Sequence, residues 1–299
     1  MGLTVDASHL ILTLKMRIAV LADIHANLTA FEAVLADVEK CGGADEIWCA
    51  GDIIGYGPDP HECIALLRKV CKVCVAGNHD LAAAGLIDTS DFNPAAAAAN
   101  RWTAQQLTPE DTDFIKCLPL MVERGDFTIV HGSPRDPVWE YLFSVEEAAK
   151  SLDCFRTPYG LVGHTHASCV FKFGRSGKVR MSTPEDGTEI KLGEERLIIN
   201  PGGVGQPRDS NPRASYGMID TDCRTFTLRR VPYDIPSVQA RMRERGLPET
   251  LWRRLTPGSH QVSPLICLFD PEVLPEFSDA ARKNRRVLTL FYYGSFWAG

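Results

Sequence analysis

The chain has 299 residues, of which 44% are hydrophobic and 23% charged, a composition typical of globular enzymes and too apolar for a disordered chain. Its 38 acidic and 32 basic residues leave a formal charge of −6, which argues against nucleic-acid binding because that class carries a basic surface. No apolar run approaches the roughly 20 residues that a membrane-spanning helix needs. The ten cysteines are too few for a disulfide scaffold and no signal peptide precedes them, so we expect free thiols and a cytoplasmic protein.

Short apolar runs alternate with helical patterns in the first quarter of the chain. Residues 1–15 show no clear link to the rest of the sequence, and Met16, directly before the first strand, could be the true start. Strands that alternate with helices predict βαβ units and a buried sheet, whose functional loops lie beyond the carboxyl ends of the strands. The predicted strands are Arg17–Asp23, Glu46–Ala50 and Lys72–Ala76, and the predicted helices are Leu28–Lys40 and Pro60–Lys69.

A helical segment interrupts this alternation. Leu81–Leu118 is rich in alanine, and Pro94 fits a first helical turn. Thr108 and Pro109 have the cap and first-turn residues of a second helix start. We therefore expect residues 81–118 to form a helical cap insertion over the sheet.

The second half of the chain is mostly strand. Ser144–Leu152 is the exception, because Ser144 and Glu147 have the capping-box spacing of a helix start. Arg241–Leu255 is basic and predicted to be helical, within a C-terminal helical extension at residues 233–257. We expect a main domain at residues 16–232, and residues 258–299 have no predicted structure. The predicted strands are Phe127–Val130, Gly160–Gly163, Leu197–Asn200, Tyr216–Asp220 and Thr225–Arg230.

Five of the eight histidines fall in loops that directly follow predicted strands. A single histidine at a strand end is more often a hydrogen-bonded structural residue than a ligand, and a Gly-Asp pair is usually a turn. Here the whole set converges on one edge of the sheet, which points to a shared site. The motifs are Asp23-Ile24-His25, Gly51-Asp52, Gly77-Asn78-His79-Asp80, His131-Gly132 and Gly163-His164-Thr165-His166.

These residue types suit a particular kind of metal site. Carboxylates, imidazoles and one amide oxygen form a mixed ligand set that suits Mn²⁺, Fe or Zn²⁺, whereas a structural zinc site would favour cysteine. There are enough ligands for two ions, which would need a bridging carboxylate. Two metals about 3.5–4 Å apart can clamp the attacking and leaving oxygens of an in-line displacement and supply a hydroxide near neutral pH.

In this order the five motifs resemble those of the calcineurin-like metallophosphoesterase superfamily, over roughly Arg17 to Arg230. The resemblance implies a four-layered αββα sandwich with two divalent metal ions at one edge and attack on phosphorus by a hydroxide between them. It also implies that His79 sits near the leaving group as general acid or electrostatic stabiliser. By the same resemblance, one metal would be held by Asp23, His25 and His166, the other by Asn78, His131 and His164, and Asp52 would bridge them.

One position departs from the superfamily's pattern. Many members continue the second motif as Gly-Asp-x-x-Asp, and their second aspartate often orients the catalytic histidine. Here Gly55 stands in its place, and the arginine that protein serine/threonine phosphatases place next is also absent. The protein-phosphatase reading is therefore disfavoured, and the partner of His79 stays open. The stretch from Gly55 to Pro60 instead resembles small prokaryotic members, some of which act on phosphodiesters or dinucleoside polyphosphates.

Other motifs give weaker predictions. The Gly-rich loop from Asn200 to Arg208 lacks the lysine of a P-loop, so it is either a tight turn or a substrate loop in which Arg208 reaches a phosphate. Arg135 and Arg213 are lesser candidates of the same kind. Tyr56 could stack on a base or leaving group or simply pack. Cys71-x-x-Cys74 precedes a strand, where a redox motif should follow one, so we expect ordinary thiols there.

We therefore expect a metal-dependent phosphoesterase that acts on a small phosphorylated substrate. The preferred substrates are phosphodiesters or dinucleoside polyphosphates, with a phosphomonoesterase or protein phosphatase as alternatives. A second hypothesis is a non-catalytic scaffold on the same fold, but such scaffolds lose ligands or the catalytic histidine, and here every position is present. A nuclease would need a basic groove, which the net charge disfavours, and the oligomeric state stays open.

Overall fold

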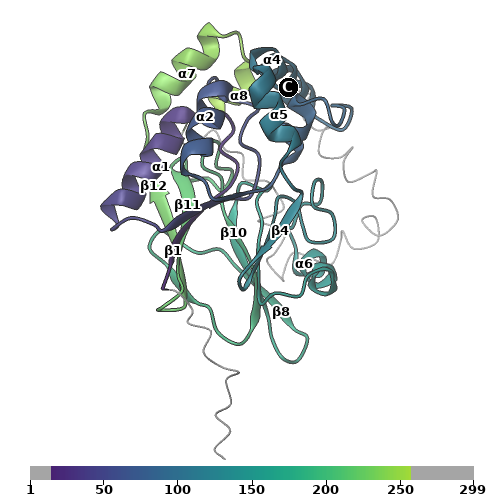
Figure 1. Ribbon diagram of the computed structural model, residues 1–299, viewed down its shortest axis with the longest axis vertical. Coiled ribbons are helices and arrows are strands. Elements are labelled where there is room, and N and C mark those ends of the chain that lie inside the picture. Colours follow the sequence, from purple (N-terminus) through teal and green to yellow (C-terminus); the bar gives the residue numbers. More distant parts are fainter. Residues whose placement is uncertain (1–14, 257–299) are drawn as a thin grey trace, which may run out of the picture. The chain divides into compact units, whose positions relative to one another are not determined.

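The computed structural model describes residues 15–256, which form packed layers of helices and strands (Figure 1). The predictions for residues 1–14 and for the tail at 258–299 lie outside this range. The helices are α1 (Leu28–Lys40), α2 (Pro60–Val70), α3 (Asn78–Ala83), α4 (Pro94–Gln106), α5 (Pro109–Lys116), α6 (Val145–Ser151), α7 (Ile235–Glu244) and α8 (Glu249–Arg253), and a 3₁₀ turn spans Leu152–Cys154. The strands are β1 (Arg17–Leu21), β2 (Glu46–Cys49), β3 (Val73–Cys74), β4 (Met121–Arg124), β5 (Phe127–Val130), β6 (Tyr159–Leu161), β7 (Ser168–Phe173), β8 (Val179–Ser182), β9 (Glu189–Lys191), β10 (Arg196–Pro201), β11 (Ala214–Asp220) and β12 (Thr225–Val231).

The strands within residues 15–256 form two six-stranded sheets. The first has the order β3-β2-β1-β11-β12-β9, and the second has the order β4-β5-β6-β10-β7-β8. Strands β1, β2 and β3 run parallel, as do β5, β6 and β10, and the remaining pairs are antiparallel. Each sheet therefore has a parallel portion whose carboxyl ends can carry a site.

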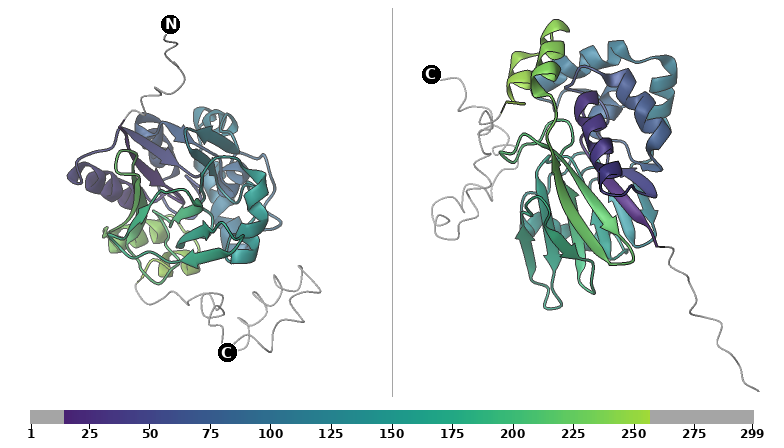
Figure 2. Two further views of the ribbon diagram at one scale, coloured as in Figure 1. Left: turned by 90° about the horizontal axis from the view of Figure 1, so that it is seen from below. Right: turned by 90° about the vertical axis from the view of Figure 1, so that its left-hand side faces the viewer.

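The two sheets pack face to face, and helices cover their outer faces (Figure 2). The core between the sheets is fully buried and includes Trp48, whose ring lies 5.5 Å from that of Phe127. Phe31 of α1 and Leu67 of α2 pack on the outer face of the first sheet. Helix α6 covers the second sheet through Ala148. The predicted four-layered αββα sandwich is confirmed.

Local capping explains where the predicted helices begin. The side chain of Asn27 accepts from the backbone N–H of Ala30 at the start of α1, whose bounds match the prediction. Thr108 and Asp111 form a capping box at α5, with Pro109 in its first turn. Ser144 forms the predicted capping box with Glu147 at α6.

The second half differs from the prediction in two ways. Strands β4, β7, β8 and β9 were not predicted. Three of them are edge strands, β4, β8 and β9, whose residues are half-buried or exposed and so give no apolar run. The helical segment predicted at Arg241–Leu255 contains the end of one helix and the whole of a second. Helix α7 starts earlier and stops at Glu244, because Gly246 adopts a left-handed backbone (φ 69°) and Pro248 then precedes α8.

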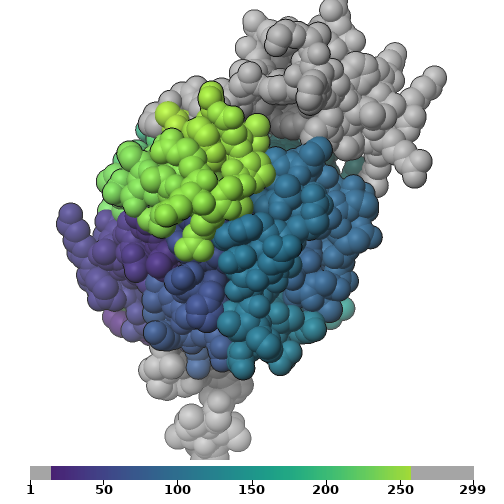
Figure 3. All heavy atoms as spheres, turned by 90° about the horizontal axis from the view of Figure 1, so that it is seen from above, coloured from purple at the N-terminus to yellow at the C-terminus, as the bar shows by residue number. Residues whose placement is uncertain are grey.

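Helices from two distant parts of the chain pack together above the sheets. Ala96 and Ala99 of α4 share an apolar cluster with Val238 and Met242 of α7. Figure 3 shows the C-terminal helices (green) lying beside the helical segment that contains α4 and α5 (blue). None of the helices in the described part of the chain is long and apolar enough to cross a bilayer.

Candidate metal centre

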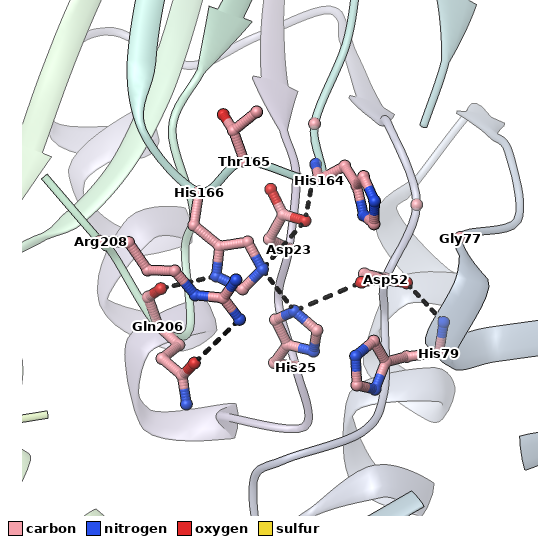
Figure 4. Close-up of polar contacts among 12 residues, drawn as sticks. Asp23, His25, Asp52, Gly77, His79, His164, Thr165, His166, Gln206 and Arg208 are labelled. Carbon is pink, nitrogen blue, oxygen red and sulfur yellow. Dashed lines mark hydrogen bonds and ion pairs between the residues drawn. The ribbon is translucent and has the colours of Figure 1, made fainter. Parts of the chain in front are cut away.

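Polar side chains meet where five parallel strands end, on the side of the sheets that carries the loops (Figure 4). Each of them is at most 4% exposed, although charged and polar groups are rarely buried so deeply without a partner. The structure brings together every position predicted to bind metal. Asp23 and His25 follow β1, Asp52 follows β2, Asn78 follows β3, His131 follows β5, and His164 and His166 follow β6.

The first cluster combines two carboxylates with two imidazoles. His25 Nε2 lies 2.9 Å from His166 Nε2 and 3.4 Å from Asp52 Oδ2. His166 Nε2 lies 3.6 Å from Asp23 Oδ1. One ligand atom of each residue lies within 4.8 Å of the others, a spacing that suits a small cation at the centre.

Backbone carbonyls determine which nitrogens face this cluster. His25 Nδ1 donates to the carbonyl of Ile54 (3.1 Å), and His166 Nδ1 donates to the carbonyl of Gln206 (2.7 Å). With each Nδ1 protonated, the two Nε2 lone pairs face one another across 2.9 Å, which is repulsive unless a cation or a proton lies between them. Metal-binding histidines ordinarily donate their second N–H in this way.

The second cluster shares a carboxylate with the first. His131 Nε2 lies 3.0 Å from His164 Nδ1, 3.2 Å from Asn78 Oδ1 and 3.4 Å from Asp52 Oδ2. His131 Nδ1 donates to the carbonyl of Ala50 (2.9 Å), which again leaves a lone pair on Nε2. Asp52 therefore belongs to both clusters, as a bridging ligand would.

Several buried polar atoms of the centre have no hydrogen-bond partner within the protein. They include Oδ2 of Asp23, Oδ2 of Asp52 and Nε2 of His164. A buried carboxylate oxygen without a partner costs the full free energy of its lost hydration. Divalent cations would satisfy both carboxylates, so this donor set fits metal binding.

The ionisation of these groups reflects their burial and their close packing. Burial raises the pKa of Asp23 to about 7. Burial also acts to raise the pKa of Asp52, but the nearby His131 and His79 outweigh it and hold that pKa well below its usual range. Burial acts to lower the pKa of His131, but the Asp52 carboxylate outweighs it and raises that pKa to about 9. Burial holds the pKa values of the other imidazoles well below their usual range, namely those of His25, His164 and His166.

The backbone of the centre is strained. Left-handed backbone is uncommon for residues other than glycine, and each case costs of order 1–3 kcal/mol, so it persists only where the surroundings enforce it. Here hydrogen bonds between ligand loops enforce it, since the N–H of His25 donates to the carbonyl of Asp52 (3.0 Å). The ligand residues with left-handed φ are Asp23 (55°), His25 (48°), Asp52 (52°), His164 (66°) and His166 (56°).

Gly77 gives Asp52 the room that it needs. A Cβ atom at Gly77 would lie 2.1 Å from Asp52 Oδ1, which is far closer than atoms can approach. The same oxygen accepts the backbone N–H of His79 (2.9 Å). The glycine therefore allows the shared carboxylate to lie against the start of α3.

His79 has no carboxylate to orient it. Its ring packs between Tyr56 and Phe92, with centroids 4.3 Å and 4.7 Å away, and its Nδ1 is buried without a partner. A Cβ atom at Gly55 would lie 2.6 Å from that Nδ1, so the ring occupies the space that a side chain there would fill. Burial lowers the pKa of His79 to about 4, which leaves the ring neutral near neutral pH.

The sequence prediction missed Asp80. Its Oδ1 accepts the backbone N–H groups of Ile53 (2.9 Å) and Ile54 (3.1 Å), and its Oδ2 accepts that of Gly77 (2.9 Å). The carboxylate thus ties the loop after β2 to the loop after β3. Asp80 is the third residue of α3 and accepts the N–H of the N-cap Gly77, which is one half of a capping box. An acidic residue at the third position of a helix is the local signal that could have found it.

Arg208 and Tyr56 lie beside the first cluster, as Figure 4 shows for the arginine. Arg208 Nη2 donates to the Tyr56 hydroxyl (3.2 Å) and to Gln206 Oε1 (3.3 Å), while its buried Nε has no partner. The Tyr56 ring lies 4.5 Å from that of His25. Both residues are therefore close enough to the centre to contact a substrate there.

The loop that carries Arg208 also contacts the backbone of His166, a candidate metal ligand. The backbone N–H of Arg208 donates to the carbonyl of His166 (3.0 Å), and Asn200 Nδ2 donates to the carbonyl of Gly163 (2.6 Å). The Gly-rich loop from Asn200 to Arg208 is therefore packed against the metal centre. The two lesser arginine candidates form ion pairs elsewhere, Arg135 with Glu140 and Arg213 with Asp186.

The cysteines of the described residues are all free thiols, including Cys71 and Cys74. Cys71 directly follows α2 and Cys74 lies in β3, so the pair does not stand at the start of a helix. A thioredoxin-like arrangement is therefore absent from this part of the chain.

Comparison with known proteins agrees with this geometry. The family model of the calcineurin-like phosphoesterase superfamily domain matches residues 16–224. The chain belongs to this superfamily. A metallophosphoesterase from Sphaerobacter thermophilus, known from its crystal structure, is 45% identical with a TM-score of 0.74, covering 82% of this chain and 99% of that one.

Two further relatives of the superfamily are similar in sequence. An uncharacterized protein of Methanocaldococcus jannaschii is 38% identical over 252 residues, which are 82% of this chain and 99% of that protein. A symmetrical bis(5'-nucleosyl)-tetraphosphatase of Nitrosococcus oceani is 29% identical over 147 residues, 46% of this chain and 50% of that enzyme. The resemblance predicted from the five motifs is confirmed, and with it membership of a metal-dependent superfamily whose members are generally hydrolases.

Proposed function

We propose that the chain is a phosphoesterase that uses two divalent metal ions to hydrolyse phosphodiesters or dinucleoside polyphosphates. The observation that carries this proposal is the Asp52 carboxylate, which belongs to two ligand clusters at once. In the proposed assignment Asp52 bridges the ions. The remaining ligands are Asp23, His25 and His166 for one ion, and Asn78, His131 and His164 for the other.

The bound ions would lower the pKa of a water molecule and neutralise negative charge on the phosphoryl group, with Mn²⁺, Fe or Zn²⁺ as candidates. The protein's part is to hold the donor atoms in place. The carbonyls of Ile54, Gln206 and Ala50 fix the histidine tautomers, and Asp80 fixes the loops that carry Asp52 and His79. The strained ligand backbone leaves little freedom for the site to relax without metal.

His79 is proposed as the catalytic residue at the leaving group. Because the pKa of His79 is about 4, the ring is neutral near neutral pH and offers one N–H as a hydrogen-bond donor. A neutral donor would stabilise the charge that develops on the leaving oxygen without needing full proton transfer. Tyr56 and Phe92 pack against the ring and restrict its orientation, a part that an aspartate often plays in other members.

Arg208 is proposed to bind a phosphate of the substrate, with Tyr56 beside it. The guanidinium lies 5.5 Å from the centre of the Tyr56 ring, and its Nε–H has no partner. It can therefore donate a hydrogen bond to an anionic group of the substrate. A charge-assisted contact of this kind orients the ester relative to the metals.

The alternative functions are less well supported. A non-catalytic scaffold would not need a complete and buried set of ligands together with His79. A protein serine/threonine phosphatase would be expected to retain the aspartate that Gly55 replaces and the arginine that follows it, whereas a phosphomonoesterase stays an alternative that the substrate panel tests. We therefore propose a small phosphorylated substrate. A cytoplasmic location is also part of the proposal.

The test is hydrolysis after removal of metal with EDTA and addition of Mn²⁺, Zn²⁺ or Fe²⁺. The substrates are bis-p-nitrophenyl phosphate, p-nitrophenyl phosphate and diadenosine tetraphosphate, with the Asp52→Asn variant as the inactive control. We expect metal-restored turnover that favours the diester or the dinucleoside polyphosphate. Absence of turnover with every metal, in protein that binds two ions, would support the scaffold instead.

A further inference from the structure

Two loops place three aromatic rings at or next to the metal centre, and only Phe92 among them has a part in the proposed phosphoester chemistry, as a packing partner of His79. The Phe92 ring, in the loop before α4, lies 4.7 Å from the His79 ring. The Trp139 ring, in the loop after β5, lies 5.6 Å from Phe92 at an angle of 78°. Tyr141, in the same loop, stacks on His164 with centroids 3.8 Å apart. We call Phe92, Trp139 and Tyr141 the aromatic wall.

The loop that carries Trp139 and Tyr141 is held by its own hydrogen bonds. The N–H of Gly132 donates to the carbonyl of Pro137 (2.7 Å), directly after the ligand His131. The N–H of Trp139 donates to Asp136 Oδ1 (3.1 Å). The loop is thus a folded unit that begins at the metal centre, and these hydrogen bonds do not involve the side chain of Trp139.

The aromatic wall is partly open to solvent. Tyr141 is 40% exposed, and Phe92 and Trp139 are half-buried, whereas the ligands beside them are buried. Tyr141 already stacks on His164 and on Phe143, and Phe92 packs on His79, whereas the ring contact of Trp139 is the edge-to-face one with Phe92. A half-buried indole placed in this way can offer its face to a planar ring. The centre itself selects only for phosphate, so any preference for the rest of the substrate must come from such neighbouring groups.

We propose that the aromatic wall, with Trp139 as its main contributor, stacks a nucleobase of the substrate and so selects nucleotide esters over base-free phosphate esters. This inference rests on the proposed function for the identity of the reacting group. It adds the substrate class, because a stacking surface recognises any base by its flat face rather than by its edge. Arg208, on the opposite ligand cluster, would hold phosphate while the wall holds the base.

The test measures binding rather than turnover. Calorimetric titration of the Mn²⁺-loaded protein compares AMP with ribose 5-phosphate, which carries the same phosphate and sugar but no base. We expect AMP to bind about tenfold more tightly, within the range that stacking of one base provides. Equal affinity for the two ligands in the wild-type protein would overturn the proposal without need of any variant.

Variants then assign the effect to Trp139. Trp139→Leu should lose the preference for AMP and leave the affinity for ribose 5-phosphate unchanged, and Trp139→Phe should restore most of it. Trp252→Leu, in helix α8, is the matched control and should keep the full preference. A full AMP preference in Trp139→Leu would overturn the role of the wall.

The outcomes separate this inference from the proposed function. If AMP is preferred but no phosphate ester is hydrolysed with any metal, the wall stands as a binding site and the phosphoesterase proposal fails. If esters are hydrolysed but AMP and ribose 5-phosphate bind equally, the phosphoesterase stands and the wall is wrong.

Discussion

The ligand loops and the loops of the aromatic wall border the same site but are built differently. The ligands follow short parallel strands closely in the chain, most have left-handed backbone, and all are buried. The wall residues lie farther from the strand ends, on the connections 84–93 and 131–144, and are partly exposed; the second connection begins with the candidate ligand His131. The sheets thus position the groups that would carry out the reaction. Loops, which generally tolerate changes in length and composition, would determine which substrate binds.

The largest expected effect comes from the residue that both clusters share. Asp52→Asn should lower kcat by more than about 10²-fold, beyond the 10–100-fold that changes to outer hydrogen-bond partners of a metal site cause. The amide keeps the shape but removes the charge that two cations would share. Steady-state kinetics together with metal analysis by mass spectrometry check this. Near-normal activity and metal content in the variant would show that Asp52 bridges nothing.

His79 separates chemistry from metal binding. His79→Ala should lower kcat by about 10²-fold, as expected for loss of a positioned donor or acid, while metal content stays at the wild-type level. The reason is that no ligand atom of either cluster belongs to His79. Equal loss of metal and activity would make His79 a ligand or a structural residue.

Gly55 tests how His79 is oriented without a carboxylate. Gly55→Ala would put a Cβ atom 2.6 Å from His79 Nδ1 and should displace the ring, lowering kcat by about tenfold with KM little changed. Gly125→Ala is the matched control, because Gly125 also has positive φ (56°) but open space around its Cα. The control carries the same kind of backbone strain, so equal effects of both variants on kcat would contradict the orientation account.

Low pH should weaken metal binding at the centre. Because the pKa of Asp23 is about 7 and that of His131 about 9 in the metal-free protein, both groups carry protons near pH 6.5 and must lose them to bind a cation. Mn²⁺ affinity should therefore rise with pH between 6 and 8, by about tenfold per pH unit for each proton released. Calorimetry in buffers of different ionisation enthalpy counts the protons released when Mn²⁺ binds. A Mn²⁺ affinity that does not change with pH, with no proton release, would contradict this prediction.

The sequence was sufficient to predict that the candidate ligands lie together, and insufficient to predict what surrounds them. Alternating strands and helices, together with polar residues directly after strands, placed His131 and His164 at one edge although they are far from Asp23 in the chain. The spacing of Ser144 and Glu147 gave the start of α6 in the same local way. These features depend on short-range patterns that the fold does not override.

The features that were missed depend on tertiary contacts. The edge strand β8 shows no apolar run because its residues are half-buried or exposed. The ring partners of His79 come from loops on different elements, so no local pattern joins Phe92 to Tyr56. Asp80 was overlooked because two of its hydrogen-bond donors lie on a neighbouring loop, at Ile53 and Ile54.

The central claim is that Asp52 is shared by two metal ions. A crystal of the Mn²⁺-loaded protein measured at the manganese absorption edge would locate the ions directly by anomalous scattering. We predict two peaks on either side of the Asp52 carboxylate, one beside His25 and His166 and the other beside His131 and His164, about 3.5–4 Å apart. A single peak, or two peaks of which only one contacts Asp52, would contradict the account.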